Sequence, residues 1–195
     1  MNRKILISCI FILSILNSTA QNYKSIKEKA EQGNATSQFN LGVMYFTGTN
    51  VTKNRTKAFQ WFEKSAKQGN SYAQQKLGYL YQYGEGVIIN KRKALLWYRK
   101  SAKQDNGKAQ FNLGLMYYNG DGVKTNKNKA FKWFKLSAEN GIARSQFNVG
   151  QMYFYGDGIL MDKKKAAKWI KKSANKGYKK AKQEWEDNEL WKYID

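Results

Sequence analysis

One serine and one lysine are the candidate residues for acyl transfer in this sequence. Ser173 and Lys176 form the only Ser-x-x-Lys motif in the chain, and this spacing can place a lysine amine beside a serine nucleophile. Neither a Ser-Asp-Asn nor a Lys-Thr-Gly motif accompanies it, and the chain has no histidine, so a Ser-His-Asp triad is excluded. Ser173 also continues the series Ser65, Ser101 and Ser137 at intervals of 36 residues. This regular spacing favours a packing role, so we predict no catalytic residue.

Three carboxylates share one position of a glycine-flanked loop. Glu85, Asp121 and Asp157 are each 36 residues apart, and acids in such loops are more often turn formers than catalytic pairs. Three carboxylates spread over separate loops are a poor ligand set for a cation. Cys9 is the only cysteine, which excludes a disulfide framework and a thiolate zinc site. The sequence therefore predicts no metal site, and we expect no cofactor and no enzymatic activity.

The first twenty residues have the pattern of an export signal. Arg3 and Lys4 precede a mostly apolar run over residues 5–16, and Ser18-Thr19-Ala20 supplies the small residues that signal peptidase requires. The run is shorter than the roughly 20 apolar residues that cross a bilayer. We expect a signal peptide over residues 1–20, cleavage after Ala20, and a periplasmic or secreted mature protein.

Beyond the signal, the sequence repeats every 36 residues without an insertion. A fixed period of this length indicates a repeat architecture in which each unit buries its apolar face against the next. Two series carry the repeat, and we interpret both as structural. They are the glycines Gly42, Gly78, Gly114 and Gly150 and the tryptophans Trp61, Trp97, Trp133 and Trp169.

Each unit is predicted to be a hairpin of two amphipathic helices. In the third unit, Ala109, Leu113, Met116 and Tyr117 follow the helical spacing i, i+4, i+7 and i+8. A glycine inside the first helix costs about 1 kcal/mol relative to alanine. We therefore expect a neighbouring helix to approach closely at the Gly42 position, with the tryptophan side chain filling the adjacent space.

Glycines and capping residues divide the chain into successive segments. The predicted boundaries are 21–34 for an N-terminal half-repeat helix, 35–70, 71–106, 107–142 and 143–178 for four full repeats, and 179–195 for a C-terminal capping helix. Asn54, Asn90, Asn126 and Asp162 are placed to cap the second helices. The predicted fold class is all-α, an α-solenoid of helical hairpins.

The third unit resembles the Sel-one-like repeat, a tetratricopeptide-related α-solenoid family. The matching residues are Ala109, Leu113-Gly114, Met116-Tyr117, Gly120, Gly122-Val123, Lys129-Ala130, Trp133 and Ala138. Four units over about residues 35–178 share the pattern, although Asn50 replaces the second loop glycine in the first unit. The resemblance implies a right-handed superhelix that binds or scaffolds proteins, in many cases exported bacterial ones.

By analogy with such solenoids, first-helix side chains that are not used for packing line a concave face. This face is rich in aromatic residues, which anchor partners well because they bury a large area for little lost rotamer freedom. Leu115 and Tyr155 belong to the same face. The predicted partner-binding residues are Phe39, Phe46, Tyr72, Tyr79, Tyr83, Lys108, Phe111, Tyr118, Arg144, Phe147, Gln151 and Phe154. The phenylalanines among them could equally be packing residues.

Charge indicates the kind of partner. The chain has 35 basic and 14 acidic residues, a net charge of +21, and lysine runs at 91–93, 124–129 and 163–165 predict a basic edge. Such a surface favours an acidic protein or an anionic surface, whereas the scarcity of arginine disfavours nucleic acid.

We therefore predict a monomeric, non-enzymatic scaffold that binds a protein or peptide through the concave face, next to a basic edge. One alternative is the weak β-lactamase or penicillin-binding activity associated with cysteine-rich relatives. A further alternative is an envelope-coating protein that acts through the basic edge alone.

Overall fold

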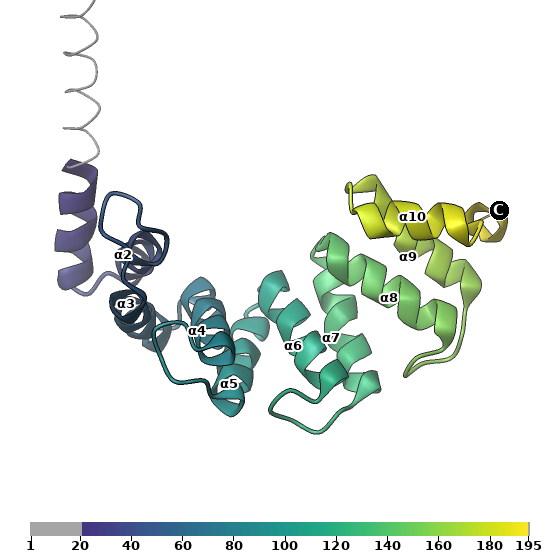
Figure 1. The fold of residues 1–195 in the computed structure, drawn as a ribbon, viewed down its shortest axis with the longest axis horizontal. Coiled ribbons are helices and arrows are strands. Elements are labelled where there is room, and N and C mark those ends of the chain that lie inside the picture. Colours follow the sequence, from purple (N-terminus) through teal and green to yellow (C-terminus); the bar gives the residue numbers. More distant parts are fainter. Residues whose placement is uncertain (1–20, 195) are drawn as a thin grey trace, which may run out of the picture. The chain divides into compact units, whose positions relative to one another are not determined.

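The computed structural model describes residues 21–194, and the predicted signal peptide lies outside this range. The described chain divides into two compact units, the first ending at Ile89 and the second beginning at Asn90. The repeat spacing continues through this boundary, so the sequence contains no sign of it. Described residues outside the helices form turns, bends and loops, and each unit consists of stacked helical hairpins, which confirms the all-α solenoid class (Figure 1).

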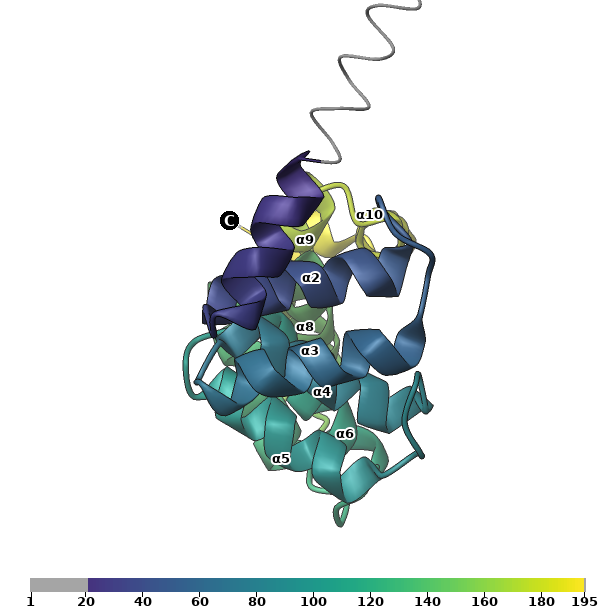
Figure 2. The ribbon, with the colours of Figure 1, turned by 90° about the vertical axis from the view of Figure 1, so that its left-hand side faces the viewer.

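The first unit is a stack of consecutive helices. Residues 21–31 are helical and are followed by α2 (Ala35–Thr47), α3 (Arg55–Lys67) and α4 (Ser71–Tyr83). Tyr23 and Ile26 pack against a cluster that contains Leu41, so the 21–31 helix covers α2 (Figure 2). Helix α3 then contacts both α2 and α4.

The second unit continues the same order of packing. Its elements are α5 (Lys91–Ala102), α6 (Gly107–Asn119), α7 (Lys127–Glu139), α8 (Ala143–Tyr155), α9 (Lys163–Asn175), α10 (Lys179–Asp187) and the 3-10 helix η1 (Leu190–Tyr193). Each helix from α5 to α9 packs on the one that follows it, and η1 touches both α9 and α10. Consecutive elements therefore bury one another, as a repeat architecture requires.

Helix ends form where the sequence predicts them. The Asn54 and Asn126 side chains accept hydrogen bonds from Lys57 N at 2.9 Å and Lys129 N at 2.8 Å, which satisfies one of the free donors at each helix start. First helices end at glycines in the left-handed conformation, as at Gly120 (φ 79°). At the one repeat end without glycine, Asp105 takes the left-handed conformation (φ 62°).

The residue that packs on the intrahelical glycine is not the tryptophan. A Cβ at Gly42 would lie 2.7 Å from Cδ1 of Phe62, and a Cβ at Gly114 would lie 2.5 Å from Cδ1 of Phe134. The prediction of close approach is therefore confirmed, and the prediction that Trp61 fills the adjacent space is wrong.

The tryptophan series lies at the flank of the buried stripe. Ala58, Phe62 and Ala66, at i, i+4 and i+8, are buried on the inner face of α3, whereas Trp61 is half-buried. The Trp61 ring packs against the buried cluster of Ala30, Leu41 and Met44. The Lys64 ammonium lies over the ring, 4.2 Å from its centroid. The same arrangement recurs at Trp169, where Lys172 lies at 4.6 Å. The indole supports the fold while remaining partly in contact with water.

Buried polar side chains tie one helix to the next. Ser65, Ser137 and Ser173 each donate to a first-helix carbonyl 30 residues earlier, at 2.7 Å. Gln38, Gln74, Gln110 and Gln146 each donate to the carbonyl of an alanine near the end of the preceding second helix. These bonds satisfy buried carbonyl groups that would otherwise be costly.

The carboxylates of the glycine-flanked loops pair with the first residue of an earlier second helix. Glu85 lies 2.8 Å from Arg55, Asp121 lies 2.6 Å from Lys91, and Asp157 lies 2.7 Å from Lys127. A cation opposes the helix dipole at this position, and the carboxylate offsets that effect. The interpretation of these acids as turn formers was therefore incomplete, because they also join successive repeats.

The C-terminal segment differs from the single capping helix predicted for residues 179–195. Helix α10 ends at Asp187, and Glu189 adopts a left-handed conformation (φ 47°) that turns the chain into η1. The turn places Leu190 in a buried cluster with Ile170 and Ala181. Burial of this leucine gives a physical reason for ending the helix early.

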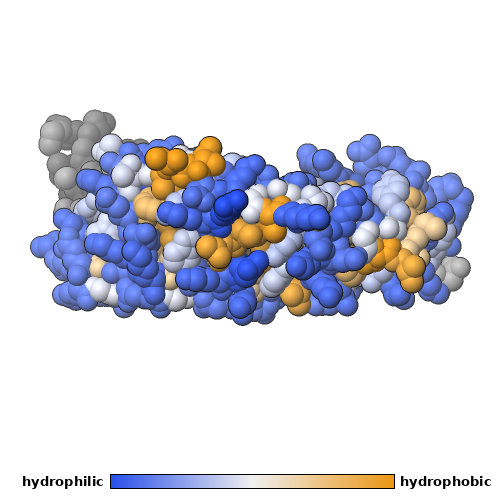
Figure 3. All heavy atoms as spheres, turned by 90° about the horizontal axis from the view of Figure 1, so that it is seen from below, coloured by the Kyte–Doolittle hydropathy of each residue, from blue (hydrophilic) through white to orange (hydrophobic). Residues whose placement is uncertain are grey.

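The face shown in Figure 3 is mainly hydrophilic, with hydrophobic side chains in small separate groups. Within residues 21–194, no helix combines the length and apolar character needed to cross a membrane.

Candidate functional site

In the first unit, the structure brings the predicted concave residues into one aromatic row. The ring centroids of Phe39 and Tyr72 lie 6.0 Å apart, those of Phe46 and Tyr79 lie 6.3 Å apart, and those of Tyr79 and Tyr83 lie 4.7 Å apart. Tyr72 and Tyr83 are exposed, whereas the two phenylalanines are half-buried. Phe39 and Phe46 also contact the buried Phe62 ring, so they join the row to the core.

In the second unit, the predicted residues separate into two groups. Phe111 is only 8% exposed and packs on Phe134, with the Arg144 guanidinium 4.9 Å from its ring centroid. Phe111 therefore packs mainly within the fold, the alternative that the sequence analysis left open for the phenylalanines. Lys108 is exposed, and Phe154 packs half-buried against the cluster around Leu190.

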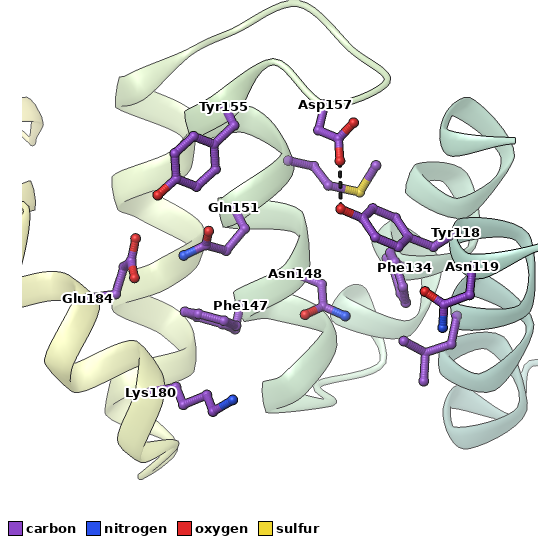
Figure 4. A pocket seen from close by; sticks show the side chains of 12 residues that line it. Tyr118, Asn119, Phe134, Phe147, Asn148, Gln151, Tyr155, Asp157, Lys180 and Glu184 are labelled. Carbon is purple, nitrogen blue, oxygen red and sulfur yellow. Dashed lines mark hydrogen bonds between the residues drawn. The ribbon is translucent and has the colours of Figure 1, made fainter. Parts of the chain in front are cut away.

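The remaining predicted residues of this unit meet at a cavity of about 560 Å³, which we call the α8 cavity. Tyr118, Phe147 and Gln151 line it, together with Leu115 and Tyr155. In Figure 4 these side chains come from α6 and α8, and α10 closes one side. The other lining residues are Asn119, Phe134, Asn148, Met152, Asp157, Lys180 and Glu184.

Sequence analysis identified Gln151 but not the asparagine side chains of the α8 cavity, Asn119 and Asn148. A signal was present, because Asn40, Asn112 and Asn148 occupy the same position of three repeats while Lys76 occupies it in the second. An asparagine side chain offers a donor and an acceptor together. With Asn119 and Gln151, Asn148 provides a set of groups that can hydrogen-bond to a peptide backbone.

A hydrogen-bonded trio fixes one wall of the cavity. The Tyr118 hydroxyl donates to Asp157 Oδ2 at 2.7 Å, and Lys127 Nζ lies 2.7 Å from Asp157 Oδ1 (Figure 4). Burial raises the pKa of Asp157, but hydrogen bonds from Lys127 and Tyr118 outweigh it and lower the pKa below its ordinary value of 3.8. The hydrogen bond to Asp157 raises the pKa of Tyr118. At neutral pH the trio therefore holds an ionised carboxylate and a neutral phenol.

The opposite wall carries one charge of each sign from α10. Lys180 and Glu184 both line the cavity, and Glu184 accepts a hydrogen bond from the Asn188 amide at 2.9 Å. With the Asp157–Lys127 pair on the other side, the charges around the cavity balance. The lining thus combines aromatic rings, amides and charges of both signs, a composition that suits a binding cavity.

Ser173 does not have the geometry of a nucleophile. Its side chain is fully buried, and its hydroxyl donates to the Ala143 carbonyl at 2.7 Å. Lys176 Nζ donates to the Gly141 carbonyl, so both side chains of the Ser-x-x-Lys motif make structural contacts with the backbone. Over residues 21–194, no group of three or more acidic, histidine or cysteine side chains is positioned to hold a metal ion.

The family of the chain follows from the repeats themselves. The sequence profile of the Sel1 repeat matches residues 35–70, 71–106, 107–142 and 143–178. The chain belongs to the Sel1 repeat family. Members of this family typically act as scaffolds for protein interactions, and the stacked hairpins described above are their common architecture.

Two solved Sel1-repeat structures are similar over most of this chain. One is c5321 of uropathogenic Escherichia coli, a protective antigen with an SLR fold, at 42% identity and a TM-score of 0.79 over 82% of this chain and 34% of that one. The other is a Sel1 repeat protein from Oxalobacter formigenes, at 37% identity and a TM-score of 0.77 over 82% of this chain and 63% of that one.

A curated relative matches a shorter segment. The secretory immunoglobulin A-binding protein EsiB of Escherichia coli O6:H1 is 44% identical over 43 residues, which is 22% of this chain and 9% of that protein. The chain thus spans less than two thirds of each of these relatives.

Proposed function

We propose that this Sel1-repeat chain is a non-enzymatic scaffold that holds a segment of a protein partner in the α8 cavity. The observation that carries the proposal is the convergence of Tyr118, Phe147, Gln151 and Tyr155 on one cavity with amides around them. A volume of about 560 Å³ lies within the range of cavities that bind ligands in proteins. The exposed aromatic row of the first unit is a separate candidate contact surface.

The chemistry of the cavity suits an extended peptide. Asn119, Asn148 and Gln151 can pair with backbone amides of the peptide, and the rings of Phe147 and Tyr155 can cover an apolar side chain. The lining holds two carboxylates, Asp157 and Glu184, and one lysine, Lys180, so the cavity itself does not select an acidic segment. The net charge of +21 favours acidic surfaces around that segment and speeds the encounter.

The names of relatives support a protein as the ligand class. The E. coli relative EsiB is named for binding secretory immunoglobulin A. Since the match covers 9% of that protein, the specific partner is not transferred to this chain. We propose only that the ligand is a protein.

Export is part of the proposal. Cleavage after Ala20 would leave a protein without cysteine, whose stability depends on packing. The mass of the protein recovered from the periplasm or the medium tests this directly, because the processed chain begins at Gln21. An uncleaved chain confined to the cytoplasm would contradict export and leave the cavity proposal to its own experiment.

Site-specific photo-crosslinking tests the cavity. A photoreactive phenylalanine analogue placed at Tyr155 or Gln151 in the producing cell should capture one defined protein. The same analogue at Lys132, an exposed residue of α7 that does not line the α8 cavity, serves as the control. The captured protein should then bind the purified chain, and the change of Asn148 and Gln151 to alanine should weaken binding without changing the thermal melt.

Two results would refute the proposal. Equal crosslinking from the control position would show that the captured protein does not choose the cavity. Full affinity in the Asn148→Ala/Gln151→Ala variant would show that the amides make no contact with the partner.

A further inference from the structure

The loop before α9 exposes apolar side chains to water. Leu160 is 91% exposed and Met161 is 63% exposed, and three lysines at 163–165 follow after Asp162. Exposure of two large apolar residues gives up much of the free energy that burial would provide. Adjacent lysines keep such a loop soluble, and they also suit it to a surface that is both apolar and anionic.

This combination is not required by the repeat. Ile88 and Ile89, 88% and 59% exposed, occupy the same positions two repeats earlier and precede another basic triplet at 91–93. The other two repeats carry Thr52-Lys53 and Lys124-Thr125 at these positions. Since polar residues serve equally well there, folding of the hairpin does not explain the apolar pairs.

In the fourth repeat, the first lysine of the second helix has no carboxylate partner among residues 21–194. Arg55, Lys91 and Lys127 each pair with a loop carboxylate. Their equivalent, Lys163, meets instead the neutral hydroxyl of Tyr193 at 3.4 Å.

The sequence around Lys163 strengthens this positive charge. Residues 163–182 contain ten lysines and no acidic residue. Lys165 pairs with Asp162 at 2.8 Å, but this acid lies just before the run.

An aromatic residue lies beside the same lysine. The contact between Lys163 and Tyr193 holds η1 against the start of α9, and Trp191 on η1 is 46% exposed. In Figure 3 a hydrophobic group lies over the last hairpin of a mainly hydrophilic face. Lysines next to exposed apolar residues are typical of proteins that rest in the headgroup region of a membrane.

From these observations we infer that the edge formed by Leu160, Met161, Lys163 and Lys164, here called the lysine edge, binds the surface of a phospholipid bilayer with anionic headgroups. The lysines attract the lipid phosphates, while Leu160 and Met161 enter the boundary between headgroups and acyl chains. Attachment is peripheral, since it uses side chains of a loop and of helix termini. This inference is independent of a protein partner in the α8 cavity.

Vesicle sedimentation tests the lysine edge. The full chain is expressed, its N-terminus is determined by mass spectrometry, and it is mixed with vesicles of phosphatidylcholine alone or with about 30% phosphatidylglycerol. We expect binding to the anionic vesicles only, weakened severalfold when salt rises from about 0.1 M to about 0.5 M. The Leu160→Ser/Met161→Ser variant should bind about tenfold more weakly, and each of Lys163→Gln and Lys164→Gln about fivefold more weakly.

Matched controls separate the edge from general charge and hydrophobicity. Leu96→Ser/Leu136→Ser removes two exposed leucines of the second helices, and Lys24→Gln/Lys29→Gln removes two exposed lysines of the 21–31 helix. Both controls should bind anionic vesicles within about twofold of the unchanged chain, since neither touches the edge. All variants are compared with the same N-terminus, so differences between them belong to the substituted positions.

Three results would overturn the inference. They are the absence of binding to anionic vesicles, unchanged binding by the Leu160→Ser/Met161→Ser variant, and equal losses in the lysine-edge and control variants. Unchanged binding after loss of the apolar pair would indicate an electrostatic surface, such as one for an acidic protein, in place of an inserting loop.

Discussion

Substitution of Gly114 by alanine tests the close approach of helices that defines each hairpin. Gly114 lies inside α6 and has ordinary helical geometry, so alanine by itself should stabilise the helix by about 1 kcal/mol. Its Cβ, however, would lie 2.5 Å from Cδ1 and 2.6 Å from Cε1 of Phe134. Favourable carbon contacts lie at about 3.5 to 4.0 Å, so the ring must move by about 1 Å.

The surroundings of Phe134 make that movement costly. The ring is 1% exposed and packs against Phe111 at 5.9 Å and Tyr118 at 6.4 Å between centroids. Overpacking of such a core typically costs about 1 to 3 kcal/mol, which exceeds the gain in helix propensity. We expect Gly114→Ala to lower the free energy of unfolding by about 1 to 2 kcal/mol, and the melting temperature by about 2 to 8 °C.

A double-mutant cycle identifies the contact. In a Phe134→Leu background the smaller side chain should relieve the overlap, so Gly114→Ala should become neutral or stabilising. In a Trp133→Leu background the cost of Gly114→Ala should persist, because the nearest atoms to the added methyl belong to Phe134. Thermal and urea unfolding measure both cycles. Stabilisation by Gly114→Ala alone, or coupling to Trp133 in place of Phe134, would refute the assignment.

Three other outcomes concern contacts between repeats. Because folding lowers the pKa of Asp157 below its ordinary value of 3.8, ionised Asp157 stabilises the folded state at pH values above about 3.8. This stabilisation is lost as the pH falls through the pKa of the folded state. The stability difference between wild type and Asp157→Asn in urea should therefore shrink below about pH 4, whereas a constant difference would contradict the pairing. Gly158→Ala should lower the melting temperature more than Gly177→Ala. Both glycines have left-handed backbone conformations, but only at Gly158 would an added Cβ lie 2.8 Å from a backbone atom of Lys127. Ser173→Ala should cost about 1 to 3 kcal/mol in unfolding and leave hydrolysis of a chromogenic cephalosporin unchanged. Loss of such hydrolysis would restore the serine as a nucleophile.

Helices and their ends could be predicted because their causes are local. An asparagine before a helix and a glycine after it act on atoms within four residues, so Asn54 and Gly120 have the same effect in any repeat. The 36-residue spacing then supplies the stacking, since a single hairpin cannot bury its own apolar face.

The orientation of adjacent aromatic residues could not be predicted from spacing alone. Trp61 and Phe62 are neighbours in sequence, and each falls near the apolar stripe of α3. The recurrence of tryptophan suggested the core, but the stripe through Ala58 and Ala66 passes over Phe62. In the fourth repeat the equivalent inner residue is Ile170, which meets Gly150. The inner position therefore tolerates a change of side chain, whereas the tryptophan that flanks it does not vary.

The candidate site was predicted only in part, because a cavity depends on side chains from helices that are far apart in sequence. Phe111 and Tyr118 are both aromatic, and aromatic residues are good partner contacts in general. Arg144 and Phe134 pack on Phe111, whereas Tyr118 lines the cavity. Lys180 and Glu184 come from α10. The sequence of this helix departs from the repeat, so no residue of it was predicted to contact a partner.

The loop between the two helices of a repeat has positions that stay the same from repeat to repeat and positions that change. Asp121 and Asp157 are equivalent, and each pairs with a cation of an earlier helix while the next glycine leaves room for that helix. Packing between repeats therefore fixes this part of the loop. A few residues later the same loop carries Lys124-Thr125 in one repeat and Leu160-Met161 in the next. Contacts within the fold do not determine these residues, so the exposed apolar pair is free to serve a surface outside the chain, as the proposed membrane contact requires.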